Sequence, residues 1–85
     1  MSRRINCKVH DEHERVIEVG VEDEGKFPWI AVWKMIKEGR GNFHTFEEGK
    51  WANVKAIERG QSKYLTTHPD GITENNLDEL KSCPI

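Results

Sequence analysis

The chain lacks most of the features that would indicate a chemical activity or a membrane location. Spanning a bilayer takes about 20 apolar residues, and no such run is present or follows the basic start at Arg3 and Arg4. We therefore expect no signal peptide and no membrane partner. The formal net charge of −2 offers no bulk electrostatic argument for nucleic acid. Nucleophile elbow, glycine-rich phosphate loop and His-Glu-x-x-His motif are absent, so we expect no cofactor and no enzymatic activity.

Cysteine is scarce, with Cys7 and Cys83 near opposite ends of the chain. Without an export signal, two reduced thiols and a cytoplasmic location are favoured over a disulfide. A weak alternative is a zinc site, because Cys7, His10 and His13 follow one another at ligand-like spacing and Cys83 could complete a set of four. Strand alternation, however, points Cys7 and His10 to opposite sides of the chain.

The length and the charge pattern both indicate one small domain. The 85 residues contain 35% hydrophobic and 33% charged side chains, which suits a small core under a well-solvated surface. Residues 29–67 carry seven basic and four acidic groups, whereas 1–28 and 68–85 are each net acidic. The pattern predicts a single domain over residues 1–85, with a modest basic face and a partly irregular tail from about residue 68.

A helix is predicted in the middle of the chain, over residues 27–39. Pro28 suits the first helical position, where its missing N–H costs nothing. Gly39 permits the left-handed conformation that ends a helix. The apolar residues at helical spacing are Trp29, Val32, Trp33 and Ile36. This stripe predicts that one side of the helix packs on a sheet.

Short runs with strand-like alternation flank the helix. They cover residues 5–9, 16–21, 43–46, 51–57 and 62–67. An acidic loop is expected at 22–26, and glycine-containing turns at 47–50 and 58–61. The order is ββαβββ, and it predicts an α+β domain in which a largely antiparallel sheet of about five strands packs on one helix. In the tail, a turn at 68–71 and a helical turn within 75–80 are expected, with Leu77 and Leu80 packing on the domain.

Alternation along 51–57 separates a core face from an outer face. The small side chains Ala52, Val54 and Ala56 share the side expected to meet the helix. The outer side would carry Trp51 and Lys55. Tyr64 and Phe43 are expected to join them, which gives the candidate binding set Phe43, Trp51, Lys55 and Tyr64.

Aromatic residues with lysines on an open sheet favour three interpretations. The first is a non-enzymatic interaction module for a protein partner, since Trp and Tyr are frequent interface anchors. The second is a module that stacks single-stranded nucleic acid bases. The third is purely structural, with Trp51 and Tyr64 pairing across strands and shielding the sheet. Self-association through an exposed edge strand is a further possibility.

Several short motifs resemble one family. His13-Glu14-Arg15 precedes a β run that ends at Gly20, and Lys37-Glu38-Gly39 closes the helix. The more specific motifs are Lys63-Tyr64-Leu65-Thr66-Thr67, Asp70-Gly71, Asn75-Asn76-Leu77 and Cys83-Pro84. With these residues the chain resembles the family called domain of unknown function 3892, small proteins of bacteria and archaea. It departs from the family pattern after Trp29 and before Cys83. The resemblance implies a shared fold, and the family has no assigned activity to carry over.

Overall fold

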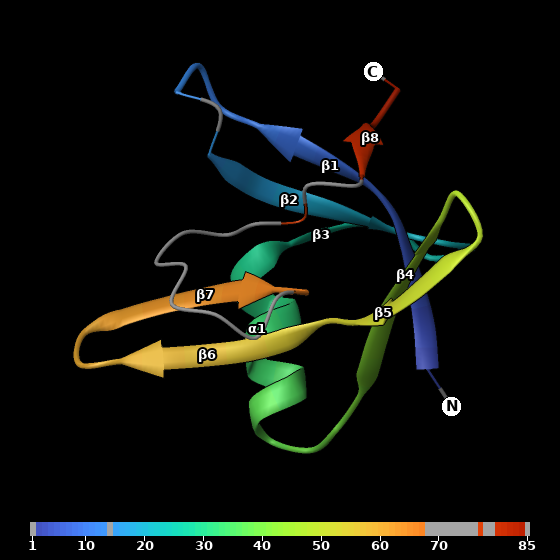
Figure 1. The fold of residues 1–85 in the computed structure, drawn as a ribbon. Helices are drawn as coiled ribbons and strands as arrows, with labels where there is room; N and C mark the ends of the chain where they lie inside the picture. Colours follow the sequence, from blue (N-terminus) through green and yellow to red (C-terminus); the bar gives the residue numbers. More distant parts are fainter. Residues whose placement is uncertain (1, 14, 68–76, 78–79, 85) are drawn as a thin grey trace.

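The computed structural model describes residues 2–13, 15–67, 77 and 80–84. Within this part the chain forms one helix and eight strands, arranged as in Figure 1. Before the helix come β1 (Ser2–His10), β2 (Val16–Val21) and β3 (Gly25–Pro28), and the helix is α1 (Trp29–Lys37). After it come β4 (Asn42–Glu47), β5 (Lys50–Asn53), β6 (Lys55–Arg59), β7 (Ser62–Thr66) and β8 (Lys81–Ser82).

The strands form two sheets. The larger has six strands, in the order β3-β2-β1-β4-β5 with β8 also paired to β1, and the smaller consists of β6 and β7. β4 and β8 are parallel to β1, and the other pairs are antiparallel. The α+β class and the largely antiparallel pairing are confirmed. The single predicted sheet is instead divided, and α1 lies beside the β6–β7 hairpin (Figure 1).

The helix begins later than predicted because an additional strand precedes it. β3 pairs with β2, so that Lys26 lies opposite Gly20 and Phe27 opposite Val19. The acidic loop predicted at 22–26 is confirmed for 22–24, which form the turn between β2 and β3, whereas Gly25 and Lys26 belong to β3. Pro28 is the last residue of β3 and the N-cap of α1, so it does not lie in the first helical turn. The end of an edge strand is a position that tolerates proline. Gly39, with a φ of 70°, follows the helix end as predicted.

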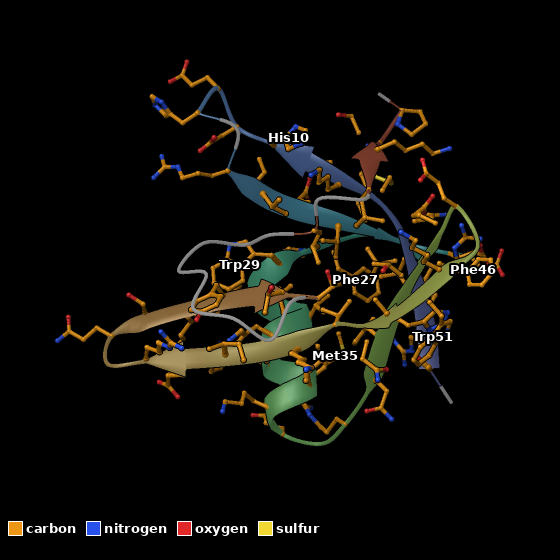
Figure 2. The ribbon with its side chains drawn as sticks, viewed as in Figure 1. His10, Phe27, Trp29, Met35, Phe46 and Trp51 are labelled. Carbon is orange, nitrogen blue, oxygen red and sulfur yellow. A yellow bond between two sulfur atoms is a disulfide. The ribbon has the colours of Figure 1, made fainter. Side chains whose placement is uncertain are left out.

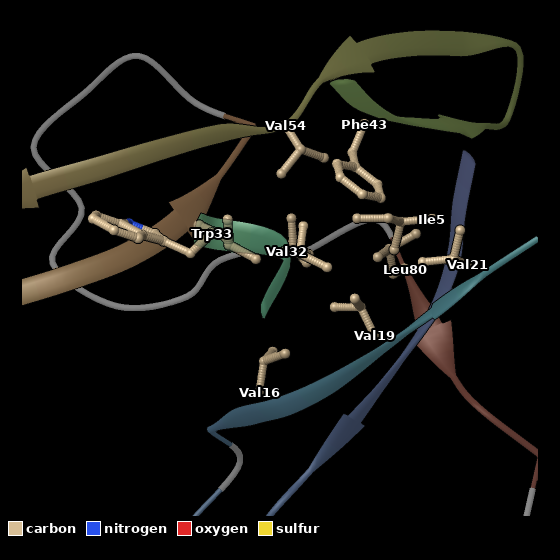
Figure 3. Close-up of a cluster of buried hydrophobic side chains, with 11 residues drawn as sticks. Ile5, Val16, Val19, Val21, Val32, Trp33, Phe43, Val54 and Leu80 are labelled. Carbon is tan, nitrogen blue, oxygen red and sulfur yellow. The ribbon is translucent and has the colours of Figure 1, made fainter. Parts of the chain in front are cut away.

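The core lies between the larger sheet and α1, and Figure 3 shows its central side chains. Val32 and Trp33 of the predicted stripe are buried, and Trp29 and Ile36 pack against them more peripherally. Trp33 also joins α1 to the smaller sheet, because its indole Nε1 donates a hydrogen bond to the Ile57 carbonyl oxygen at 3.0 Å. The buried cluster consists of Ile5, Val16, Val19, Val21, Val32, Trp33, Phe43, Val54, Leu65, Leu77 and Leu80.

The segment predicted as one strand from 51 to 57 is interrupted at Val54. Its side chain is buried, and its N–H donates to the Phe43 carbonyl oxygen at 2.9 Å. There the chain leaves the larger sheet and continues into β6 of the smaller one. The predicted core face is confirmed in part, because Val54 is buried and Ala56 packs against the core, whereas Ala52 is half-buried.

The C-terminal part of the chain is held by two buried leucines and one strand. Leu77 and Leu80 are buried, as predicted, and β8 pairs with β1. The expected turn at 68–71 and most of the expected helical turn within 75–80 lie outside the described residues. In the part of the chain that the structure describes, no helix is both long and apolar enough to cross a membrane.

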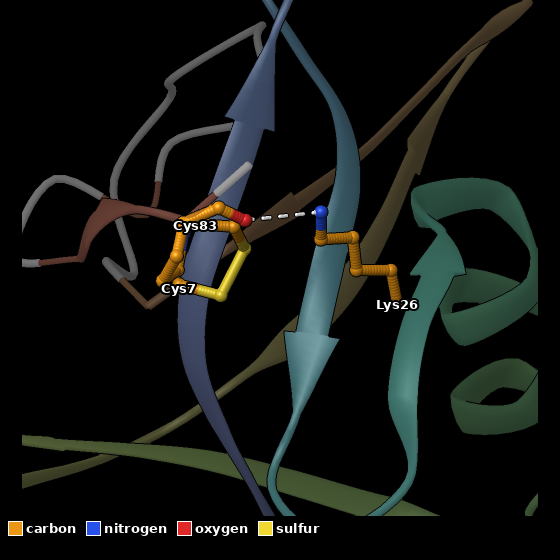
Figure 4. Close-up of a disulfide and its surroundings, with 4 residues drawn as sticks. Cys7, Lys26 and Cys83 are labelled. Atoms are coloured by element: carbon orange, nitrogen blue, oxygen red, sulfur yellow. Dashed lines mark hydrogen bonds between the residues drawn. A yellow bond between two sulfur atoms is a disulfide. The ribbon is translucent and has the colours of Figure 1, made fainter.

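Cys7 and Cys83 form a disulfide, so the prediction of two reduced thiols was wrong. Parallel pairing of β8 with β1 places Lys81 opposite Cys7, and the Cys83 N–H donates to the Lys8 carbonyl oxygen at 2.9 Å. The two cysteine Cα atoms are therefore only 4.8 Å apart, despite a separation of 76 residues in sequence. Lys26 adds a hydrogen bond from its Nζ to the Pro84 carbonyl oxygen at 3.2 Å (Figure 4).

Gly20 lies directly opposite Cys7 in the β1–β2 ladder. A Cβ at this position would overlap the Cys7 Sγ and lie 3.2 Å from the Cys83 Sγ. We expect Gly20→Ala to lower the free energy of unfolding by about 1–3 kcal/mol, since sulfurs bonded to each other cannot move aside independently. Urea unfolding measures the change. In a variant with both cysteines replaced by alanine, the same substitution should cost much less, and an equal cost in both backgrounds would contradict the explanation.

Candidate interaction face on strands β4 and β5

The β4–β5 hairpin determines which side chains face outward. Its two-residue turn consists of Glu48 and Gly49, with φ values of 51° and 77°, as in the type I′ turns that suit the twist of paired strands. The register places Phe46 opposite Trp51 and His44 opposite Asn53. Because side chains alternate along a strand, these four share the outer side of the sheet.

Three rings are grouped on this outer side, and we call His44, Phe46 and Trp51 the aromatic face. The rings of His44 and Trp51 are stacked, with centroids 5.1 Å apart and planes inclined by 21°. Trp51 is 52% exposed and Phe46 is 44% exposed. Figure 2 shows both near the hairpin, at the side of the molecule away from His10. Two large aromatic side chains therefore remain open to solvent side by side.

Strand β1 supports the aromatic face from one side. The Ser2 Oγ lies 2.6 Å from the His44 Nδ1, within hydrogen-bonding distance. The Arg4 Nη2 donates to the Phe46 carbonyl oxygen at 2.7 Å, and the guanidinium carbon lies 5.9 Å from the Phe46 ring centroid. These contacts orient the rings before any partner arrives, which lowers the entropy lost on binding.

The two arginines beside the aromatic face form ion pairs within the domain. Arg3 forms an ion pair with Glu24 at 3.2 Å. Arg4 pairs with Glu22 and with Glu47, each at 3.4 Å. The rim of the face is consequently of mixed charge, and neither arginine offers an uncompensated positive charge.

Comparison with known proteins gives a family but no function. The model of the family described as Protein of unknown function (DUF3892) matches residues 4–81 of this 85-residue chain. The chain belongs to the DUF3892 family. This confirms the resemblance seen in the sequence motifs. No curated protein and no solved structure matches the chain.

The fold of this DUF3892 chain does not bring the four predicted binding residues onto one face. Phe43 is 1% exposed and Tyr64 is 2% exposed, so both belong to the interior. Lys55 is exposed but opens β6, in the other sheet. Trp51 is the one member that lies on the aromatic face. Trp51 and Tyr64 do not pair across strands either, since Tyr64 lies opposite Ile57.

Sequence reasoning missed His44 and Phe46 as surface residues of the DUF3892 chain. In the sequence, alternation along β4 places Phe43 and Thr45 on one side of the strand and His44 and Phe46 on the other. It does not indicate which of the two sides faces the core. The structure shows Phe43 and Thr45 buried. An aromatic residue stands on each side of the strand, so hydrophobicity alone could not decide.

The alternative zinc set does not assemble in this DUF3892 chain. Cys7 and Cys83 are bonded to each other, so neither offers a thiolate. His13 is exposed in the turn after β1, where its backbone N–H donates to the Asp11 Oδ1 at 2.8 Å. The N–H of Arg15 also donates to this oxygen, and chiefly this bond lowers the pKa of Asp11. Among the described residues, no three His, Cys, Asp or Glu side chains form a cluster that could hold a metal ion.

Proposed function

We propose that this protein is a non-enzymatic interaction module that binds a protein segment through the aromatic face. The observation that carries the proposal is the pair of exposed rings, Phe46 and Trp51, held in place by His44 and Arg4. Large aromatic side chains with fixed orientation provide contact area at low entropic cost, and Trp is among the residues that dominate interface energies.

The charges near the face favour a protein partner over single-stranded nucleic acid. Nucleic acid binding combines base stacking with a positively charged groove along the phosphates. Here Arg3 and Arg4 are already paired with glutamates, and Glu48 is exposed at the tip of the hairpin. A mixed-charge rim around an apolar centre is the arrangement common in protein interfaces.

A cytoplasmic location stays a prediction. The disulfide argues against it, since disulfides are rare in reducing compartments.

Trp51→Ala should weaken binding of peptides selected against the protein from a random display library by at least about tenfold, the loss typical of an interface anchor. Titration calorimetry on purified peptides measures the affinity. Ile17→Ala is the matched control, because Ile17 is 43% exposed and lies outside the aromatic face. It should leave the affinity unchanged. Equal affinity of the Trp51→Ala and wild-type proteins for every selected peptide would overturn the proposal.

The same two variants distinguish the nucleic acid alternative. A single-stranded oligothymidylate serves as probe in a fluorescence anisotropy titration at several salt concentrations. We expect no binding that depends on Trp51. Tight binding that falls steeply with salt and disappears in Trp51→Ala would instead assign the face to nucleic acid.

A further inference from the structure

Strand β5 lies at one end of the larger sheet. Within the described residues it pairs with β4 and with no other strand. Lys50, Trp51 and Asn53 are exposed along it. Edge strands are commonly protected by shortness, lysines, proline, bulges or inward-pointing charges. β5 has four residues and one charge, Lys50, at its turn end, but from Trp51 to Asn53 it carries no charge and no proline and keeps a regular register with β4. The edge is therefore open to pairing.

The phase of the hydrogen bonds shows which backbone groups of β5 point away from β4. In an antiparallel pair, bonded and non-bonded residue pairs alternate. The two-residue turn makes Glu47 and Lys50 a bonded pair, and the bond from the Val54 N–H to the Phe43 oxygen fits the same phase. Trp51 and Asn53 thus occupy non-bonded positions, and their N–H and C=O groups point outward from the sheet.

We infer that a second copy of this chain pairs with β5 in antiparallel orientation, about a two-fold axis at Ala52. The inference goes beyond the proposed function, because the pairing uses backbone groups of β5 and leaves the aromatic face open for a separate partner. In this register Trp51 of each copy lies opposite Asn53 of the other. Each copy presents two donors and two acceptors to the identical set, so four backbone hydrogen bonds form. Such self-complementarity is what a two-fold interface requires.

The side chains of β5 suit this register. Ala52 is half-buried and small, so the two strands can approach closely at the axis, where non-bonded Cα atoms are about 4.5 Å apart. Trp51 and Asn53 point to the same side, so the aromatic faces of the two copies become one continuous surface.

Asn53→Pro tests the pairing, because it removes one outward N–H on each copy and no bond to β4. Sedimentation velocity across a concentration series should show a dimer for the wild-type protein, a dimer for the matched control Asn53→Ala, and a monomer for Asn53→Pro. A wild-type protein that is monomeric throughout, or an equally stable dimer in Asn53→Pro, would overturn the inference. A monomer that still binds peptides through Trp51 would leave the proposed function standing.

Amide hydrogen exchange tests the pairing in the wild-type protein, where no substitution can disturb the fold. The Trp51 and Asn53 amides should become protected as the protein concentration rises. The Ala52 amide, which faces β4, should be protected at every concentration. Rapid exchange of Trp51 and Asn53 at all concentrations would contradict the pairing.

Discussion

Replacing Cys7 and Cys83 together with alanine should lower the free energy of unfolding by about 4–5 kcal/mol. In the chain-entropy model, a cross-link that closes a long loop stabilises by restricting the unfolded chain, by about 3 kcal/mol for 15 residues and 4.7 for 100. Here the bonded residues are 76 apart in sequence, so the disulfide closes almost the whole chain. A small domain has only about 5–15 kcal/mol of stability in total, and the loss would be a large part of it.

The structure also indicates where the loss is felt. β8 has two residues, and with Leu77 and Leu80 it holds the described C-terminal segment against β1 and the core. Chemical denaturation with and without dithiothreitol compares the two states of the wild-type protein. The reduced protein should unfold at a lower denaturant concentration and resemble the double alanine variant. An unchanged midpoint under full reduction, verified by mass spectrometry, would show that the cross-link does not stabilise the fold.

Phe43→Ala should cost about 3–5 kcal/mol of stability, the usual range for an aromatic residue removed from a core. The Phe43 side chain is almost fully buried and belongs to the central cluster. The Arg3 guanidinium carbon lies 5.7 Å from the centroid of its ring. Trp51→Ala, by contrast, should cost about 1 kcal/mol or less, because Trp51 is half exposed and loses mainly its contacts with neighbouring rings. Urea unfolding of both variants measures the difference.

The comparison separates two roles that the sequence could not. Phe43 and Trp51 both entered the predicted binding set, and the structure assigns one to the core and the other to the surface. A mild effect of Phe43→Ala, or a loss above about 3 kcal/mol for Trp51→Ala, would reverse this assignment. Binding assays of Phe43→Ala are informative only on the folded fraction.

The helix and the two later hairpins were predictable because their signals are local. The apolar stripe of α1 repeats at helical spacing, and Gly39 follows the helix end with positive φ. Glycine marks the turn at Gly49 and the turn at Gly60, also with positive φ. Each of these features depends on a few consecutive residues, so spacing and glycine content suffice to identify them.

β3 was not predicted because it has no local signal of its own. The run Gly25–Pro28 is too short and too polar to show alternation, and it becomes a strand because β2 offers it a partner. The interruption at Val54 was missed because alternation continues across it. There the buried side chain and the bond to Phe43 turn the chain from one sheet to the other. Neither event leaves a mark within the segment itself.

By itself the sequence determined the α+β class, the amphipathic helix, the hairpin turns and the family of this protein. Only the tertiary structure decided that Cys7 meets Cys83, that Phe43 and Tyr64 are buried, and that His44 and Phe46 join Trp51 on the surface. The physical reason is the range of the interactions. Periodicity and turn geometry act over a few residues, whereas the side of a strand that faces the core, and the partner of a cysteine, depend on chain segments brought together from opposite ends of the sequence.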